Sequence, residues 1–213
     1  LKHKADSIAS NVTRDMDAFN TRGVTADTIS QFQENIALFD SMPDEVEVQG
    51  DASIATELKD EQAEALRVHI RTIRTMAGNV WHKDSAIYRS FGFEGMDEMN
   101  DERLYRLGKR VTRVATARLT DLSGQGLTAT MINNLLISCT NFDAAIDNQE
   151  AAESNRDIKT QARIESGNLV YKDLIRLSNT GKDLWAATNE AKYNDYVIYD
   201  TPGDPPANEP LVP

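Results

Sequence analysis

The stretch RGVTADTI at Arg22–Ile29 returns almost unchanged as QGLTATMI at Gln125–Ile132. In each copy a threonine, Thr25 or Thr128, is a candidate N-cap, because its hydroxyl can accept hydrogen bonds from free backbone N–H groups of a first helical turn. The apolar residue before it and the isoleucine four residues after it have the spacing of a hydrophobic staple. The preceding glycine suits the left-handed conformation that ends a helix. Each stretch therefore predicts a tight corner between two helices.

The similarity continues on both sides of the corner at an offset of 103 residues, which grows by single insertions further along the chain. Trp81 then aligns with Trp185, and Tyr88 aligns with Tyr193. A match that keeps these aromatic residues and the apolar spacing predicts a tandem duplication. The alternative is that two amphipathic helical segments resemble each other only because such segments share one spacing.

The pattern predicts an all-α fold, because apolar residues recur at three-and-four spacing and the interior of the chain is nearly free of proline. We expect an internally duplicated helical bundle of two three-helix repeats, related by a pseudo-twofold axis, with roughly six helices. VEVQG at Val46–Gly50 is expected to be a loop. The expected helices are Asp6–Asn20, Ala26–Ser41 and Ser53–Arg89 in the first repeat, and Asp101–Leu122, Ala129–Asn148 and Ala151–Lys192 in the second.

These helices define the expected domain organisation. Residues 1–92 form the first repeat, residues 93–100 a connector, and residues 101–199 the second repeat. Residues 200–213 are a proline-rich tail that should be extended. We expect the two repeats to pack together as one domain, since each alone would leave an apolar face exposed.

Composition narrows the range of partners. The net charge of −11 argues against binding to nucleic acid, which requires clustered Lys and Arg, and against docking on anionic lipid. No run of eighteen apolar residues is present, so no direct membrane insertion is expected. The basic residues Lys109, Arg110, Arg113 and Arg118 are interpreted as a solvated helix face. The single cysteine, Cys139, lies in an apolar stretch and is expected to be a small core residue.

No known catalytic pattern is present in the sequence. The histidines His69 and His82 lack the glutamate three residues before them that a di-iron bundle requires. Neither a phosphate-binding glycine loop nor a nucleophile elbow appears. We therefore predict no catalytic residue, no cofactor and no metal site, and we expect that the protein is not an enzyme.

Aromatic residues after each long helix have two possible roles. Trp81, Tyr88, Trp185 and Tyr193 are expected to close the bundle ends as structural caps. The alternative is that they form twin aromatic pockets for a ligand. Two further residues, Tyr196 and Tyr199, are candidates for contact with a neighbouring protein.

The segment GKDLWAATNEAKYNDYVIYDTP and the corner GLTATMINNLLISCTNFDAAI resemble parts of a loose group of all-helical tandem-repeat proteins of Bacteroidota-type bacteria. The resemblance covers Gly126–Pro202. That group has no assigned activity, so the resemblance implies a duplicated helical fold and no site residue. The sequence as a whole favours a non-enzymatic structural or protein-interaction module, in a larger surface or extracellular assembly, that binds a protein partner or itself. The alternative is a helical sensor domain that binds a small ligand.

Overall fold

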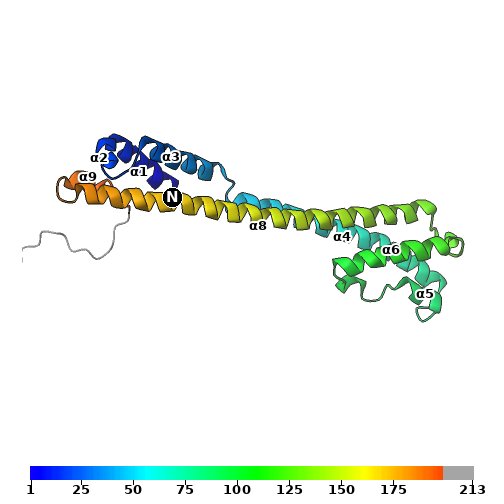
Figure 1. Ribbon diagram of the computed structural model, residues 1–213. Coiled ribbons are helices and arrows are strands. Elements are labelled where there is room, and N and C mark those ends of the chain that lie inside the picture. The colour runs from blue at the N-terminus through cyan, green and yellow to red at the C-terminus, as the bar shows by residue number, and fades with distance from the viewer. Residues whose placement is uncertain (199–213) are drawn as a thin grey trace, which may run out of the picture. The chain divides into compact units, whose positions relative to one another are not determined.

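A computed structural model describes residues 1–198, and the regular secondary structure of this part of the chain is entirely helical, without a strand (Figure 1). The predicted all-α class is confirmed. The expected tail and Tyr199 lie outside the described residues. The helices are α1 (Lys2–Arg14), α2 (Met16–Asn20), α3 (Ala26–Ser41), α4 (Glu45–Val80), α5 (Ala86–Phe91), α6 (Asp101–Ala117), α7 (Leu119–Leu122), α8 (Ala129–Trp185) and α9 (Glu190–Asn194), with 3-10 turns η1 (Met96–Glu98) and η2 (Ser123–Gln125).

Both predicted corners form as the sequence indicates. The Thr25 hydroxyl accepts a hydrogen bond from the Thr28 N–H at 3.3 Å, and the Thr128 hydroxyl accepts one from the Met131 N–H at 3.2 Å. The glycines two residues before these threonines have φ angles of 76° and 89°, which only glycine adopts without strain. The apolar staple residues around each cap are buried: Val24, Ile29, Leu127 and Ile132.

Two expected helices are each interrupted once, at residues 103 positions apart in the sequence. The helix expected over Asp6–Asn20 is broken at Asp15, which has φ −103° and ψ 20°. The helix expected over Asp101–Leu122 is broken at Arg118, which has φ −114° and ψ 17°. No proline or glycine marks either break, so the sequence pattern could not place them.

The prediction of a loop at Val46–Gly50 is wrong, since these residues lie within the first turns of α4. Three residues, Met42, Pro43 and Asp44, separate α3 from α4. Pro43 holds Met42 in an extended conformation, with ψ 139°, because a residue before proline avoids the helical region. The expected helix over Ser53–Arg89 also ends early, and α5 restarts after the N-cap Ser85.

The helices expected over Ala129–Asn148 and Ala151–Lys192 are instead one continuous helix, α8. The predicted break at the polar residues between them is wrong. These residues contain neither glycine nor proline, and polar side chains on a solvated surface do not end a helix. The remainder of the second expected helix forms α9, which follows the N-cap Asn189.

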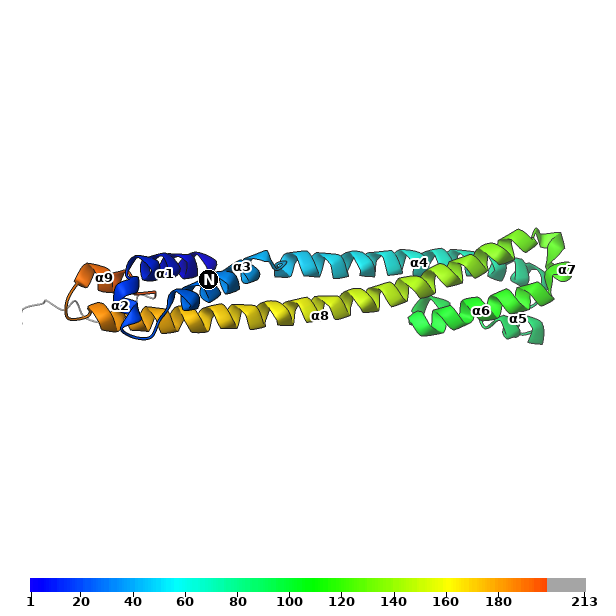
Figure 2. The same cartoon turned by 45° about the horizontal axis from the view of Figure 1, so that its top comes forward.

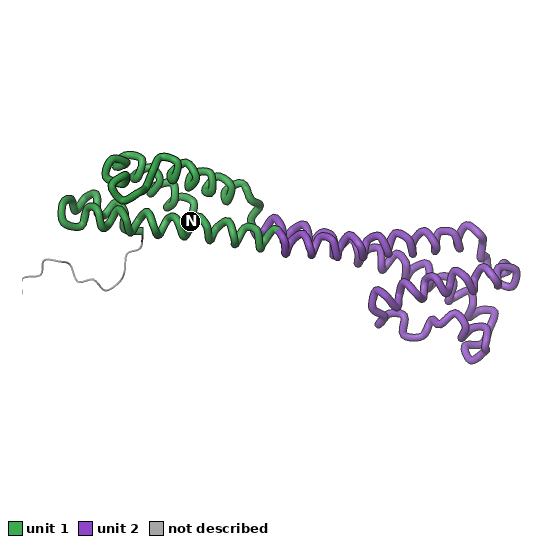
Figure 3. The backbone as a smooth tube through the Cα atoms, viewed as in Figure 1, with its two compact units in different colours: residues 1–44, 159–213 green, residues 45–158 purple. Residues whose placement is uncertain are grey.

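The described chain divides into two compact units, coloured green and purple in Figure 3. Figure 2 shows the helices of both units in a second view. Unit 1 consists of residues 1–44 together with the chain from residue 159 onward, and unit 2 consists of residues 45–158. Helix α8 contributes its first part to unit 2 and its remainder to unit 1. These limits differ from the expected repeat boundaries.

Each unit has a core of its own. In unit 1, α1, α2 and α3 pack against the later part of α8 and against Tyr196. In unit 2, α4, α5, α6 and α7 pack with the first part of α8. Cys139 is fully buried in this second core, which confirms the prediction that it is a core residue. There its sulfur lies beside Gly108.

Candidate functional site

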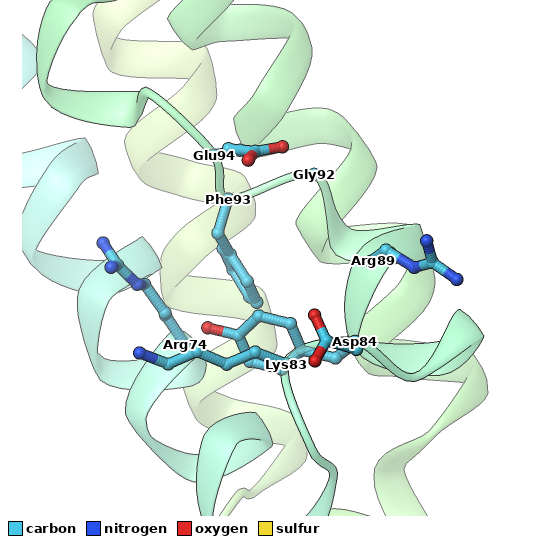
Figure 4. A pocket seen from close by; sticks show the side chains of 8 residues that line it. Arg74, Lys83, Asp84, Arg89, Gly92, Phe93 and Glu94 are labelled. Carbon is cyan, nitrogen blue, oxygen red and sulfur yellow. The ribbon is translucent and has the colours of Figure 1, made fainter.

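A pocket of about 410 Å³ opens in unit 2 beside the junction of α4 and α5 (Figure 4). This size is sufficient for a small organic ligand. Its lining combines cationic, acidic and aromatic side chains. The lining residues are Arg74, Lys83, Asp84, Tyr88, Arg89, Gly92, Phe93 and Glu94.

Local structure positions these residues. Arg74 projects from the last turns of α4. Lys83 and Asp84 belong to the short link before α5, in which the Asp84 carboxylate lies 3.3 Å from Nδ1 of His82. The Ser85 hydroxyl caps α5 by accepting a hydrogen bond from the Tyr88 N–H at 3.2 Å. Gly92 then ends α5 in the left-handed conformation, with φ 75°, and turns the chain back across the pocket.

Phe93 forms a fixed aromatic wall of the pocket. It is only 4% exposed, and its ring stacks on Phe91 with a centroid distance of 5.0 Å. The Tyr88 ring lies against Phe93 at 5.5 Å and is tilted by 59°. Because Phe91 and Phe93 belong to the core of unit 2, this wall is anchored from behind and does not depend on a ligand for its position.

A second, smaller pocket of about 220 Å³ adjoins the first and shares Gly92 with it. Three arginines of α6, Arg103, Arg106 and Arg110, line this second pocket beside Met99 and Leu107. A β-carbon added to Gly92 would lie 2.4 Å from Nη1 of Arg110. The absence of a side chain at Gly92 therefore allows the Arg110 guanidinium to lie at the junction of the two pockets.

A third pocket, of about 520 Å³, is acidic. Asp101, Glu102, Asp143 and Glu150 line it together with Tyr105. Burial and the nearby Asp143 carboxylate raise the pKa of the Tyr105 hydroxyl. Within residues 1–198 no group of three or more His, Cys, Asp or Glu side chains is arranged to hold a metal ion.

The four predicted aromatic caps are all half-buried. Trp81 and Tyr88 pack against the core of unit 2, and Tyr88 also lines the first pocket. Trp185 packs against the core of unit 1, where the Lys192 ammonium lies 4.2 Å from its ring centroid. Tyr193 lies in α9. Trp81 and Tyr88 are thus brought together in one unit, and Trp185 and Tyr193 in the other.

Tyr196, expected to contact a neighbouring protein, is instead fully buried in unit 1. Its ring lies 5.4 Å from that of Phe19, and its hydroxyl donates a hydrogen bond to Asp15 at 3.0 Å. Lys192 also donates to Asp15, at 2.6 Å. Burial opposes ionisation of Asp15, but the hydrogen bonds from Arg14, Lys192 and Tyr196 outweigh it and lower its pKa to about 2.

The sequence interpretation missed the cationic pocket. The sequence pattern predicts a solvated helix face for Arg110 and no site role for Arg74, Lys83 or Arg89. A signal was present, because these last three cations lie within sixteen residues around a predicted helix end. Their convergence with Arg103 and Arg110 depends on the packing of α5 on α6, which the sequence pattern does not specify.

Comparison with known proteins assigns the chain to no group: no family model, no curated protein and no solved structure matches it. The resemblance of residues 126–202 to helical tandem-repeat proteins stays a prediction. In the described part of the chain, every helix is too short or too polar to cross a bilayer.

Proposed function

We propose that the protein is a non-enzymatic structural or protein-interaction module and a subunit of a larger surface or extracellular assembly. The supporting observation is the first half of α4, where Val46, Ile54 and Leu58 are 80%, 58% and 53% exposed. Ile54 and Leu58 are one helical turn apart and therefore project from the same side of the helix. Exposed apolar side chains at helical spacing are typical of a surface that binds another protein.

The charge around these side chains indicates what kind of partner would fit. The segment from residue 45 to residue 64 contains a single basic residue, Lys59, which pairs with Asp101 at 2.9 Å. A partner surface with apolar residues surrounded by Lys and Arg would complement it. The acidic residues of this segment are Glu45, Glu47, Asp51, Glu57, Asp60, Glu61 and Glu64.

Light scattering after gel filtration, over a concentration series, tests self-association. We expect the double variant Ile54→Ser/Leu58→Ser to associate less than the wild type at every concentration. Leu38→Ser is the matched control, because Leu38 lies in unit 1 and is as exposed as Leu58, at 53%. If the double variant and Leu38→Ser change the solution mass by the same amount, this face of α4 is not the surface of self-association.

A strictly monomeric wild type would rule out self-association and leave a different protein as the partner. The probe for that case is a synthetic amphipathic helix with leucines flanked by lysines, titrated by calorimetry. We expect it to bind the wild type more tightly than the double variant, and more tightly than a glutamate-flanked peptide binds. Equal binding of both peptides would contradict the proposed interaction surface.

The pocket beside α5 favours a second candidate function, the binding of a small ligand. It combines a fixed aromatic wall with several cations in a volume suited to an organic molecule. A thermal shift of the protein with a small molecule, abolished by substitution of pocket residues, would support this function. The two candidate functions use different surfaces of unit 2 and can be tested separately.

We also infer that the chain is a tandem duplication whose two copies exchange helices between the units. Three observations support this inference: the corners share cap and glycine geometry, the breaks at Asp15 and Arg118 share backbone angles, and both pairs lie 103 residues apart. Under this inference, α1 to α3 of one copy pack with the end of α8 and α9 of the other copy in unit 1. In unit 2, α4 and α5 of the first copy pack with α6, α7 and the first part of α8 of the second copy.

Exchange of the corner sequences tests the duplication. Replacing Gly23–Ile29 by the sequence of Gly126–Ile132 should leave the free energy of unfolding within about 1 kcal/mol, since cap and staple residues are equivalent. The same insert shifted by one residue should destabilise unit 1 by several times more. Equal losses for the aligned and the shifted insert would contradict the equivalence of the two corners. The pseudo-twofold relation of the copies stays a prediction.

A further inference from the structure

We propose that the pocket between α4, α5 and residues 92–94 binds an oxyanion, a phosphate or a carboxylate, carried on a flat apolar group. Arg74 and Lys83 would bind the anion, and the wall formed by Tyr88 and Phe93 would contact the flat group. This inference rests on the second candidate function, ligand binding, and specifies the chemistry of the ligand. It is independent of the interaction surface on α4.

The first argument is that, in the part of the chain that the structure describes, five of the six cations lining the two adjoining pockets lack a carboxylate partner; the sixth, Arg106, pairs with Glu102. Within the described residues, no carboxylate oxygen lies within 4 Å of the charged groups of Arg74, Lys83, Arg89, Arg103 or Arg110. Most other arginines pair with a carboxylate, as Arg14, Arg22, Arg71, Arg118 and Arg176 do. Arg163 bonds to main-chain carbonyl groups instead, which leaves Arg113 as the other unpaired arginine of the described chain.

Unpaired arginines are unexpected in a chain with 34 acidic and 23 basic residues. Their concentration around two adjoining pockets produces a local positive potential in a protein of negative net charge. Such a potential attracts anions to this place and away from the rest of the surface. Guanidinium groups in particular bind phosphate and carboxylate through paired N–H donors.

The second argument is that the same row of arginines already holds an anion within the protein. Arg71, one turn before Arg74 on α4, donates to the Asp97 carboxylate at 2.7 Å. Arg67 and Arg74 add to the electrostatic attraction and, with Arg71, lower the pKa of Asp97. Arg74 is the next member of this row. It lines the pocket and, within the described residues, forms no ion pair of its own.

The third argument concerns the shape of the pocket. Its volume of about 410 Å³ is several times that of an inorganic phosphate, so an anion alone would leave most of it unfilled. In Figure 4, Arg74 and Lys83 project to one side of Phe93, and Arg89 lies on the other side. An anionic group near Arg74 and Lys83 therefore places the remainder of the ligand against the aromatic wall.

The two carboxylates of the pocket limit which ligands fit. Asp84 is strongly exposed and lies beside His82, and Glu94 lies on the surface after Gly92. Their negative charges repel anionic groups, so they disfavour the binding of a ligand that is anionic over its whole length. They can accept hydrogen bonds from a hydroxyl or amino group. A ligand with one anionic end and a flat, neutral body fits all of these constraints.

Titration by two-dimensional NMR tests the inference, with phenyl phosphate and benzoate as probes. We expect amide shifts confined to residues 83–94 and the end of α4, with a Kd on the order of 1 mM or tighter for a ligand this small. Arg74→Gln and Lys83→Gln should each weaken binding by about ten-fold, the loss of one charge-assisted hydrogen bond. Arg118→Gln is the control, since Arg118 is an exposed arginine of the same unit and lies outside the pocket.

Phenol and inorganic phosphate distinguish the possible outcomes. Weaker binding of both than of phenyl phosphate supports the inference, and the ratio of phenyl phosphate to benzoate affinity identifies the preferred anion. Equal binding of phenol, insensitive to Arg74→Gln, would overturn the oxyanion inference and leave ligand binding in place. If none of the four probes shifts the pocket resonances at about ten times the expected Kd, the inference and the ligand-binding function both fail. Unchanged thermal unfolding of each variant verifies that it is folded.

Discussion

The hydroxyl of Tyr196 donates a hydrogen bond of 3.0 Å to Oδ2 of Asp15, a residue 181 positions earlier in the chain. Lys192 and Arg14 donate to the same carboxylate, at 2.6 Å and 2.7 Å. Asp15 lies at the break between α1 and α2, so the carboxylate fastens the C-terminal end of the described chain to the first two helices. Within unit 1, this contact therefore holds the segment after α8 against α1 and α2.

Removal of the Tyr196 hydroxyl should destabilise unit 1. Tyr196→Phe keeps the buried ring and deletes only the donor to Asp15, so we expect a loss of about 1.5–3 kcal/mol in the free energy of unfolding, as for a hydrogen bond to a charged group. Urea unfolding followed by circular dichroism measures it. Tyr193→Phe, at a half-buried ring of the neighbouring helix, should change stability by less than about 0.5 kcal/mol. Equal losses would show that the hydroxyl is unimportant.

Acid should weaken the same unit in a defined pH range. The Asp15 pKa is about 2 in the folded state and about 3.9 in an unfolded chain. Because the folded pKa is lowered, the ionised carboxylate stabilises the fold above pH ~4, and this contribution, roughly 2 kcal/mol, is lost as the pH falls from ~4 towards ~2. Asp15→Asn should be less stable at pH ~7 and should lose less stability over that range. If the free energies of unfolding of the wild type and Asp15→Asn fell in parallel over this pH range, Asp15 would not be the group responsible for the acid sensitivity.

Gly181 provides the space in which the Tyr196 ring lies. A β-carbon at this position would lie 2.2 Å from Cγ of that ring, so Gly181→Ala should displace the tyrosine and cost about 1–3 kcal/mol despite the higher helix propensity of alanine. Gly78→Ala is the control, because its nearest neighbour would be 3.8 Å away. That variant should be unchanged or more stable, by up to about 1 kcal/mol. Thermal unfolding of both variants measures the difference.

A close approach also exists in unit 2, between Gly108 and Cys139. A β-carbon on Gly108 would lie 2.6 Å from the cysteine sulfur and 3.1 Å from Cδ1 of Leu66. Gly108→Ala should therefore cost about 1–3 kcal/mol. Addition of Cys139→Ala removes the sulfur and should restore part of this loss, so the double variant is more stable than the sum of the single effects predicts. Strict additivity would mean that the two residues do not interact.

Unit 2 is a contiguous segment with its own core, so residues 45–158 alone should fold. We expect a helical circular dichroism spectrum and a single cooperative unfolding transition. Burial raises the pKa of the Cys139 thiol, so this thiol should react slowly with iodoacetamide in the folded fragment and rapidly in urea. Rapid alkylation without denaturant would show that unit 2 needs the rest of the chain.

Much of the local structure was determined by the sequence alone. The corner residues Thr25 and Thr128 act through bonds to backbone groups three residues away, and the glycines before them through their own φ angles, so neither depends on distant parts of the chain. The expected helix end at Asn148 is wrong, although the sequence has neither glycine nor proline between Asn148 and Ala151, where α8 continues. Polar residues on a solvated surface do not require a helix to end.

The tertiary structure alone decided which helices pack together and what their side chains meet. Tyr196 lies in a polar segment that looks exposed in the sequence, yet it is buried, because Gly181 leaves room for its ring and Asp15 accepts a hydrogen bond from its hydroxyl group. The cations of the candidate pocket come from α4, α5 and the link between them, and Gly92 joins them to the arginines of α6. Local spacing records the face on which a residue lies within its own helix. It carries no information on which other helix covers that face, since that depends on the packing of the whole unit.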